Sequence, residues 1–98
     1  MSLRALHYTD RVQFECQANP GSFMLESRRA SGRFEFVYFC PCGCGLKNRL
    51  LIGELHKPTG PRPSWRWNGS RTAPSLDPSV HHIDHWHGWL RDGYWEVC

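Results

Sequence analysis

Three cysteines at alternate positions, in the segment Cys40-Pro41-Cys42-Gly43-Cys44-Gly45, constrain this chain more than any other feature of its sequence. Structural zinc sites hold the ion tetrahedrally with four Cys or His ligands, and glycines permit the tight turns that bring alternate cysteines around one ion. A chain of 98 residues has room for one hydrophobic core, and domains of this size commonly depend on a metal or a disulfide. We therefore predict a single zinc-binding domain over residues 1–98.

The five cysteines do not form the pattern of a secreted disulfide framework. Their number is odd, cysteines two residues apart are poorly placed to bond to each other, and residues 1–10 contain no apolar signal segment. No apolar run approaches the roughly 20 residues that span a bilayer. The expectation is a protein of the reducing cytoplasm that does not associate with membranes.

Alternation of aromatic and polar residues predicts a mainly β protein with little helix. The clearest strand runs from Arg33 to Cys40, and the segment 56–63 predicts a loop because it contains three prolines and a glycine. Asn68-Gly69 predicts a tight hairpin turn. Further strands are expected at 11–16, 22–26, 46–55 and 65–67, with an extended segment at 73–80 and a hairpin over 88–97. The expected fold is a small antiparallel sheet or sandwich stapled by one zinc site.

The remaining metal ligands are expected about forty residues after the cysteines, in the segment His81-His82-Ile83-Asp84-His85-Trp86-His87. If all three cysteines bind zinc, one histidine completes the set, and His87 is the first choice. If two cysteines bind, His87 is joined by His85 or Asp84. The candidate ligands are therefore Cys40, Cys42, Cys44, Asp84, His85 and His87.

A structural zinc is favoured over a catalytic one. Thiolate-rich ligand sets weaken the Lewis acidity that hydrolysis requires, and no carboxylate is placed as an evident general base. A catalytic zinc keeps an open position for water, and the clustered His85, His87 and Asp84 are similar to metallohydrolase ligands. No catalytic residue is assigned from the sequence.

Charge and tryptophan content give little support to nucleic-acid binding. The chain has 12 Lys and Arg against 9 Asp and Glu, a net charge of only +3. The basic residues are scattered rather than clustered. Trp65 and Trp67, with Arg66 between them, could stack on bases. Aromatic residues at alternating strand positions in so small a chain are more often core residues, which is the interpretation we prefer.

Four sequence blocks, in order, carry a family resemblance. They are Cys40-Pro41-Cys42-Gly43-Cys44-Gly45, Trp67-Asn68-Gly69, Ser75-Leu76-Asp77-Pro78-Ser79-Val80 and Trp86-His87-Gly88-Trp89-Leu90-Arg91-Asp92-Gly93. Over about Phe36 to Val97 the chain resembles the small phage and bacterial proteins catalogued as domain of unknown function sixty-five twenty-seven. The order of the blocks is more specific than any one of them.

The resemblance implies a compact zinc-binding domain, often encoded in phages, in prophages or near bacterial genes for ubiquitin-like conjugation, without an established activity. It also implies a Cys-x-x-His pair before the last hairpin. His87 matches the histidine of that pair, whereas Asp84 stands in place of the cysteine. What completes the site therefore stays open: Asp84 coordinates, or His85 does, or all three cysteines bind together with His87.

Together these observations favour a non-enzymatic, zinc-stabilised binding module, encoded by a phage or prophage, that acts through a protein partner such as a host defence or conjugation factor. The first alternative is a zinc-dependent hydrolase or isopeptidase-like enzyme that uses His85, His87 and Asp84. The second is a nucleic-acid-binding protein. The sequence does not indicate the partner's identity or the oligomeric state.

Overall fold

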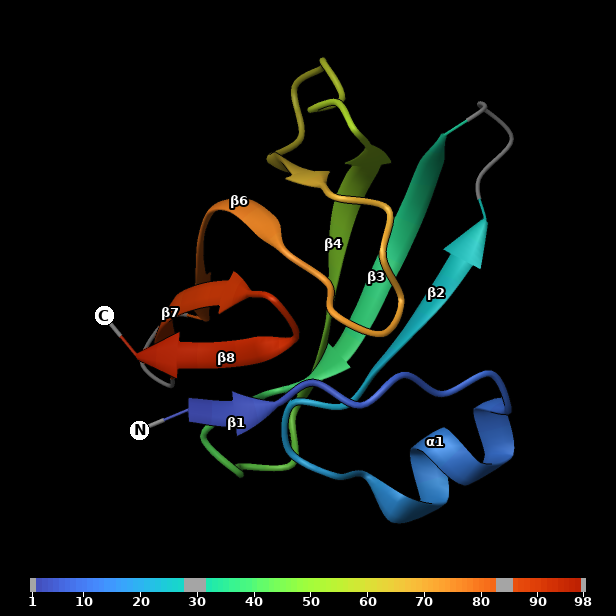
Figure 1. Ribbon diagram of the computed structural model, residues 1–98. Helices are drawn as coiled ribbons and strands as arrows, with labels where there is room; N and C mark the ends of the chain where they lie inside the picture. Colours follow the sequence, from blue (N-terminus) through green and yellow to red (C-terminus); the bar gives the residue numbers. More distant parts are fainter. Residues whose placement is uncertain (1, 28–31, 83–85, 98) are drawn as a thin grey trace.

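The computed structural model describes residues 2–27, 32–82 and 86–97, which form eight strands and one helix (Figure 1). The strands belong to one sheet, in the order β1-β8-β7-β6-β5-β4-β3-β2. The prediction of a mainly β fold is confirmed. The elements are β1 (Ser2–Arg4), α1 (Arg11–Gln17), β2 (Phe23–Ser27), β3 (Arg33–Phe39), β4 (Lys47–Glu54), β5 (Ser64–Trp67), β6 (Leu76–His82), β7 (Trp86–Arg91) and β8 (Tyr94–Val97).

The segment 11–16 was expected as a strand, and this prediction is wrong, because Arg11–Gln17 is the helix α1. The alternation of Val12 and Phe14 with polar residues is typical of a strand, but the local backbone is capped as a helix. The Asp10 carboxylate accepts hydrogen bonds from the N–H groups of Val12 (2.8 Å) and Gln13 (3.2 Å). The capping group therefore outweighs the side-chain pattern.

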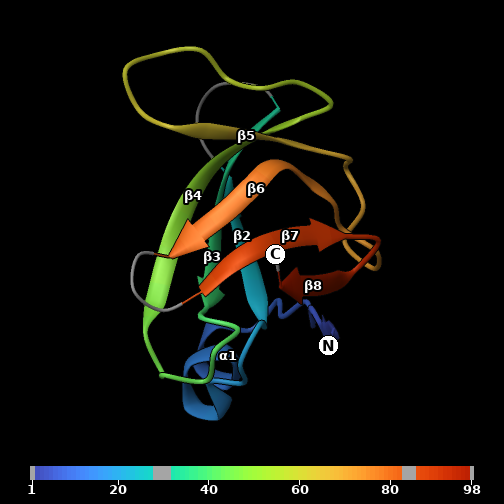
Figure 2. The ribbon, with the colours of Figure 1, turned by 90° about the vertical axis from the view of Figure 1, so that its left-hand side faces the viewer.

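The other predicted strands are present, with ends shifted by one or two residues. Two connections differ from expectation. Strand β4 pairs with β5 in parallel, because the proline-rich loop over residues 55–63 carries the chain back to the start of β5 (Figure 2). Asn68-Gly69 does not form a two-residue hairpin, since β5 and β6 are joined by residues 68–75. The Asn68 amide holds that loop by hydrogen bonds to Ser70, Ala73 and Ser75.

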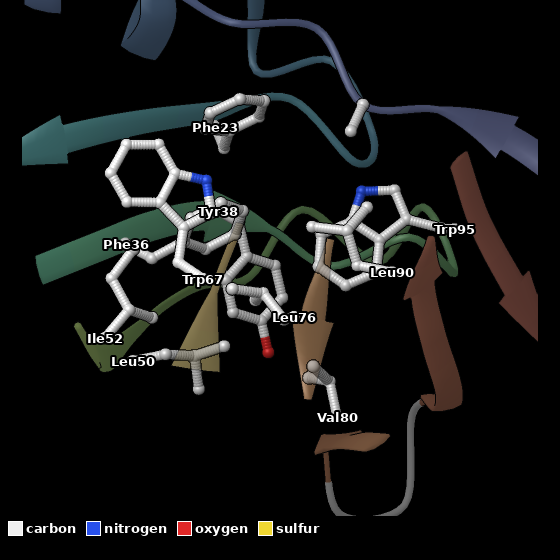
Figure 3. Close-up of a cluster of buried hydrophobic side chains, with 11 residues drawn as sticks. Phe23, Phe36, Tyr38, Leu50, Ile52, Trp67, Leu76, Val80, Leu90 and Trp95 are labelled. Carbon is white, nitrogen blue, oxygen red and sulfur yellow. The ribbon is translucent and has the colours of Figure 1, made fainter. Parts of the chain in front are cut away.

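The sheet curls until its two ends meet. The Tyr8 N–H donates to the Phe23 carbonyl and the Phe23 N–H donates to the Leu6 carbonyl, both at 2.9 Å, so the segment after β1 pairs with the start of β2. Curling encloses one core of large side chains, and Figure 3 shows them pointing toward one another from different strands. Trp67 is fully buried in this core, which removes it from any stacking surface. A smaller cluster of Phe14, Val37 and Phe39 lies beneath α1.

Within the described residues, no helix is long and apolar enough to cross a membrane.

Candidate functional site

The outer face of strands β6 and β7 presents a serine and two histidines. Val80 pairs with Gly88 and His81 pairs with His87 across the two strands. Because successive side chains of a strand point to opposite faces, the buried Val80 and Leu90 define the core side, and Ser79, His81 and His87 lie on the other. Figure 2 shows these two strands side by side. Three side chains with hydroxyl and imidazole groups therefore share an accessible surface.

Ser79 and His87 are in hydrogen-bonding contact. The Ser79 Oγ lies 3.3 Å from the His87 Nε2, and the ring of His81 lies 4.8 Å from that of His87. Among the serine side chains that the structure describes, Ser79 has the one recorded hydrogen bond to a histidine ring. Ser79 is half-buried and His87 is exposed, so the pair is held by the sheet and still open to solvent. A serine hydroxyl in contact with an imidazole nitrogen can be activated as a nucleophile.

An irregularity in β6 places Ser79 at this position. The pairing of β6 with β7 shifts register between Leu76 and Val80, a segment that contains Ser79. Such bulges redirect a side chain relative to a regular ladder and are frequent beside active sites. The Trp65 indole N–H donates to the Ser79 carbonyl at 3.2 Å, which anchors the backbone of the irregular segment to β5.

Gly88, the residue after His87, allows β7 to lie close to β8. A Cβ atom at this position would be 2.0 Å from the Glu96 carbonyl oxygen and 2.6 Å from the Trp86 ring. No side chain fits there, so a glycine next to His87 is a packing requirement.

A second group of reactive side chains lies in the connection between β3 and β4. The sulfur atoms of Cys40, Cys42 and Cys44 all lie within 4.8 Å of one another, and those of Cys40 and Cys42 are 3.2 Å apart. Tetrahedral zinc with Zn–S bonds of about 2.3 Å requires sulfurs roughly 3.8 Å apart, so small side-chain adjustments would suit the ion. Gly43, between Cys42 and Cys44, and Gly45, after Cys44, have φ angles of +86° and +83°, a backbone conformation that favours glycine.

The Cys40 thiol is the buried member of this cluster. Burial raises the pKa of Cys40 to about 12; the backbone hydrogen bond with Cys42 lowers it, and the side-chain hydrogen bonds with Cys42 and Cys44 raise it. A bound divalent cation would reverse this preference, because a thiol that coordinates a metal loses its proton. The three cysteines could therefore hold a metal ion.

The predicted metal ligands fall into three groups. Cys40, Cys42 and Cys44 are brought together, as expected. His87 is not part of this cysteine group and contacts Ser79 instead. Asp84 and His85 lie outside the described residues. The complete ligand set stays a prediction.

Sequence reasoning did not single out Ser79. Ser79 lies in the block Ser75-Leu76-Asp77-Pro78-Ser79-Val80, one of the four blocks of the family resemblance. The spacing of eight residues between Ser79 and His87 does not by itself predict a contact. The contact depends on how β6 and β7 pair.

Comparison with known protein families gives a match over most of the chain. The family named BubE and described as bacterial ubiquitination-like system serine protease matches residues 8–98. No curated protein and no solved structure shows significant similarity to the chain.

This match corrects two expectations from the sequence. The family is BubE and not the zinc-binding phage family catalogued as domain of unknown function sixty-five twenty-seven. The interpretation as a non-enzymatic binding module is also wrong, because the matching family is a protease family. Of the earlier alternatives, a hydrolase or isopeptidase-like enzyme agrees better with the match. The Ser79–His87 contact offers a serine, rather than a zinc ion, for the chemistry.

Proposed function

The chain belongs to the BubE family of bacterial ubiquitination-like system serine proteases, and we propose that it is a serine protease with Ser79 as nucleophile and His87 as general base. The observation that carries the proposal is the 3.3 Å contact between the Ser79 Oγ and the His87 Nε2. This distance lies slightly beyond the usual hydrogen-bond range, and such pairs are often looser in the absence of substrate.

The contact supports acyl transfer in two steps. With the imidazole proton on Nδ1, the His87 Nε2 accepts the Ser79 proton as Oγ forms a bond to the substrate carbonyl carbon. His87 then gives this proton to the leaving nitrogen as the C–N bond breaks, which leaves an ester on Oγ. Water attacks the ester while Nε2 accepts its proton. The carboxylic acid leaves, and Oγ regains a proton from His87.

The open position of the pair favours a polypeptide substrate. His87 is exposed on the outer face of the sheet, where a protein chain can reach it without entering a deep cavity. The family description supports a role within a ubiquitination-like system. We therefore propose that the bond cleaved is the peptide or isopeptide bond formed by the C-terminal carbonyl of a ubiquitin-like protein.

We propose that the three cysteines hold zinc as a structural ion. Thiolates suit zinc, and Cys40, Cys42 and Cys44 already converge. If Nε2 of His87 serves Ser79, Asp84 or His85 is left to complete the set. Bound zinc would stabilise the connection between β3 and β4. Thiolates persist in a reducing compartment, so this proposal also places the protein in the cytoplasm.

A fluorophosphonate reagent tests the proposed nucleophile without knowledge of the substrate. Such a reagent loses fluoride to an activated serine oxygen, and the mass of the intact chain reports one adduct. We expect labelling at Ser79 and none in Ser79→Ala. His87→Gln should slow labelling by roughly 10²- to 10⁴-fold, since that is the usual contribution of a general base.

The matched controls are Ser27→Ala and His56→Gln. Ser27 is exposed at the end of β2, and the His56 ring contacts only the Glu54 carbonyl among its recorded hydrogen bonds. Both should label like the unmodified chain, and all four variants should keep its circular dichroism. Labelling that persists in Ser79→Ala would show that another residue is the nucleophile.

A further inference from the structure

A cavity of about 300 Å³ lies on the sheet surface where β5, β6 and β7 run together. Its charged and aromatic lining comes from Arg66, Asp77, Trp89 and Arg91. Arg66 pairs with Asp77 across β5 and β6, and their neighbours Trp67 and Leu76 are buried on the core side. The cavity therefore opens on the same outer face as Ser79 and His87.

The cavity begins two residues along β7 from His87, at Trp89. His87, Trp89 and Arg91 occupy alternate positions of β7 and so point to the same face. Two residues of a strand span about 7 Å, so Trp89 lies about 7 Å and Arg91 about 13 Å beyond His87 along the strand. An extended peptide with its cleaved bond at Ser79 would place residues two to four positions away over this cavity.

The lining of the cavity is basic, because it contains two arginines and one aspartate. Among the described residues, neither Arg66 nor Arg91 has a recorded ion pair or side-chain hydrogen bond. Asp77 also lines the cavity and has no recorded ion pair in this part of the chain, so the lining has one net positive charge. The Arg91 guanidinium lies 4.3 Å from the centre of the Trp89 ring, and stacking leaves its edge for hydrogen bonds.

Asn68 and Ser75, which also line the cavity, are held in place by hydrogen bonds. The Asn68 side chain accepts from the Ser70 and Ser75 N–H groups, both at 3.1 Å. The Ser75 hydroxyl accepts from the Asp92 N–H at 2.8 Å. The cavity is thus formed before a ligand arrives, which lowers the entropic cost of binding.

We propose that this cavity binds a carboxylate of the substrate, two to four residues from the bond attacked by Ser79, through Arg66 and Arg91. Guanidinium groups match carboxylates in geometry and charge. The carboxylate belongs either to an acidic side chain or to the free C-terminus of the substrate. This inference rests on the proposed protease function and adds the substrate feature that the enzyme recognises.

The preference of the cavity for a carboxylate is measured by how well a peptide protects Ser79 from labelling by the fluorophosphonate. Three acetylated hexapeptide probes of Ala, Gly and Gln are compared. The first is a set of peptides with a C-terminal amide, in which a single Glu occupies each position in turn. The second has no Glu and a free C-terminal carboxylate. The third is neutral throughout. We expect at least one acidic probe to protect Ser79 at a concentration roughly 10- to 100-fold below that of the neutral probe, as for hydrogen bonds to charged groups.

Variants separate this preference from a general charge effect. Within each variant, protection is measured against its own labelling rate without peptide. Arg66→Gln and Arg91→Gln should lose the preference, and Arg66→Glu should favour probes in which Lys replaces Glu. The matched control is Arg33→Gln, in β3, which should keep the preference.

The outcomes distinguish recognition of a side-chain carboxylate, recognition of a C-terminal carboxylate, failure of this inference and failure of the protease proposal. Protection by the Glu-containing probe supports recognition of a side chain, and protection by the free-acid probe supports recognition of a C-terminus. Equal protection by all three probes, or equal loss of the preference in Arg33→Gln, overturns the inference while the protease proposal stands. Failure of the unmodified chain to label at Ser79 contradicts the proposed function and removes this inference with it.

Discussion

At the scale of single residues, location decides what a histidine does. His87 is exposed beside the Ser79 hydroxyl, where a neutral imidazole can accept a proton. His7 is half-buried and stacks on Phe23 with ring centres 5.1 Å apart. Burial, and second the charge of Arg71, lower the pKa of His7 below its ordinary value. The first histidine serves chemistry in our proposal, and the second serves packing.

This pKa shift predicts how stability depends on pH. Because the native pKa of His7 is lowered, the unfolded chain binds more protons in the window below about pH 6.5. The free energy of unfolding should therefore fall as pH drops from 7.5 through 6.5 to the native pKa. Urea unfolding at several pH values measures the slope. His7→Gln should reduce the slope, and an unchanged slope would mean that other groups cause it.

At the scale of elements, strands β6 to β8 position the Ser79–His87 pair, and Gly88 sets their spacing. Gly88→Ala would place a Cβ atom 2.0 Å from the Glu96 carbonyl oxygen, which belongs to backbone and cannot rotate away. We expect a loss of roughly 1–3 kcal/mol or more in unfolding free energy. Fluorophosphonate labelling of Ser79 should also slow, because β7 must shift. An unchanged melting temperature would show that β8 moves freely.

The helix α1 depends on its capping residue. Asp10→Ala removes the acceptor for the Val12 and Gln13 N–H groups and should cost roughly 0.5–2 kcal/mol in unfolding free energy. Asp10→Asn is the matched control, since an asparagine caps about as well as an aspartate. Urea unfolding of both variants measures the difference. Equal losses in the two would assign the effect to the charge of Asp10 and not to capping.

At the scale of the whole molecule, the proposed zinc would join two connections that are distant in sequence. Cys40, Cys42 and Cys44 lie between β3 and β4, while Asp84 and His85 lie between the ends of β6 and β7. Binding energy from a structural ion is also folding energy. A zinc ion bound by these residues would therefore stabilise the folded chain as well as the turn that contains the cysteines.

Metal removal tests this arrangement. We expect about one zinc per chain by elemental analysis, and a lower melting temperature after chelation. Cys42→Ser should lose the zinc and the stability together. Cys16→Ser, which changes an exposed cysteine of α1, is the control that should keep both. Full zinc content in Cys42→Ser would show that Cys42 is not a ligand.

Much of the strand content could be predicted because it depends on local alternation. Strands β3 and β4, the loop after β4 and the last hairpin were all anticipated, and so was the convergence of the three cysteines, since ligands two residues apart can meet in one glycine-rich turn. The helix α1 was missed although Asp10 carried the capping signal. There, two local signals disagreed, and the hydrogen bonds to backbone N–H groups prevailed over side-chain alternation.

The sequence by itself determined the β content and the cysteine cluster, because each of these depends on neighbours along the chain. Only the tertiary structure decided the parallel pairing of β4 with β5 and the contact between Ser79 and His87. That contact requires a particular register of two strands and an irregularity within one of them. Register depends on how the buried faces of all the strands fit together, so no local pattern in the sequence specifies it.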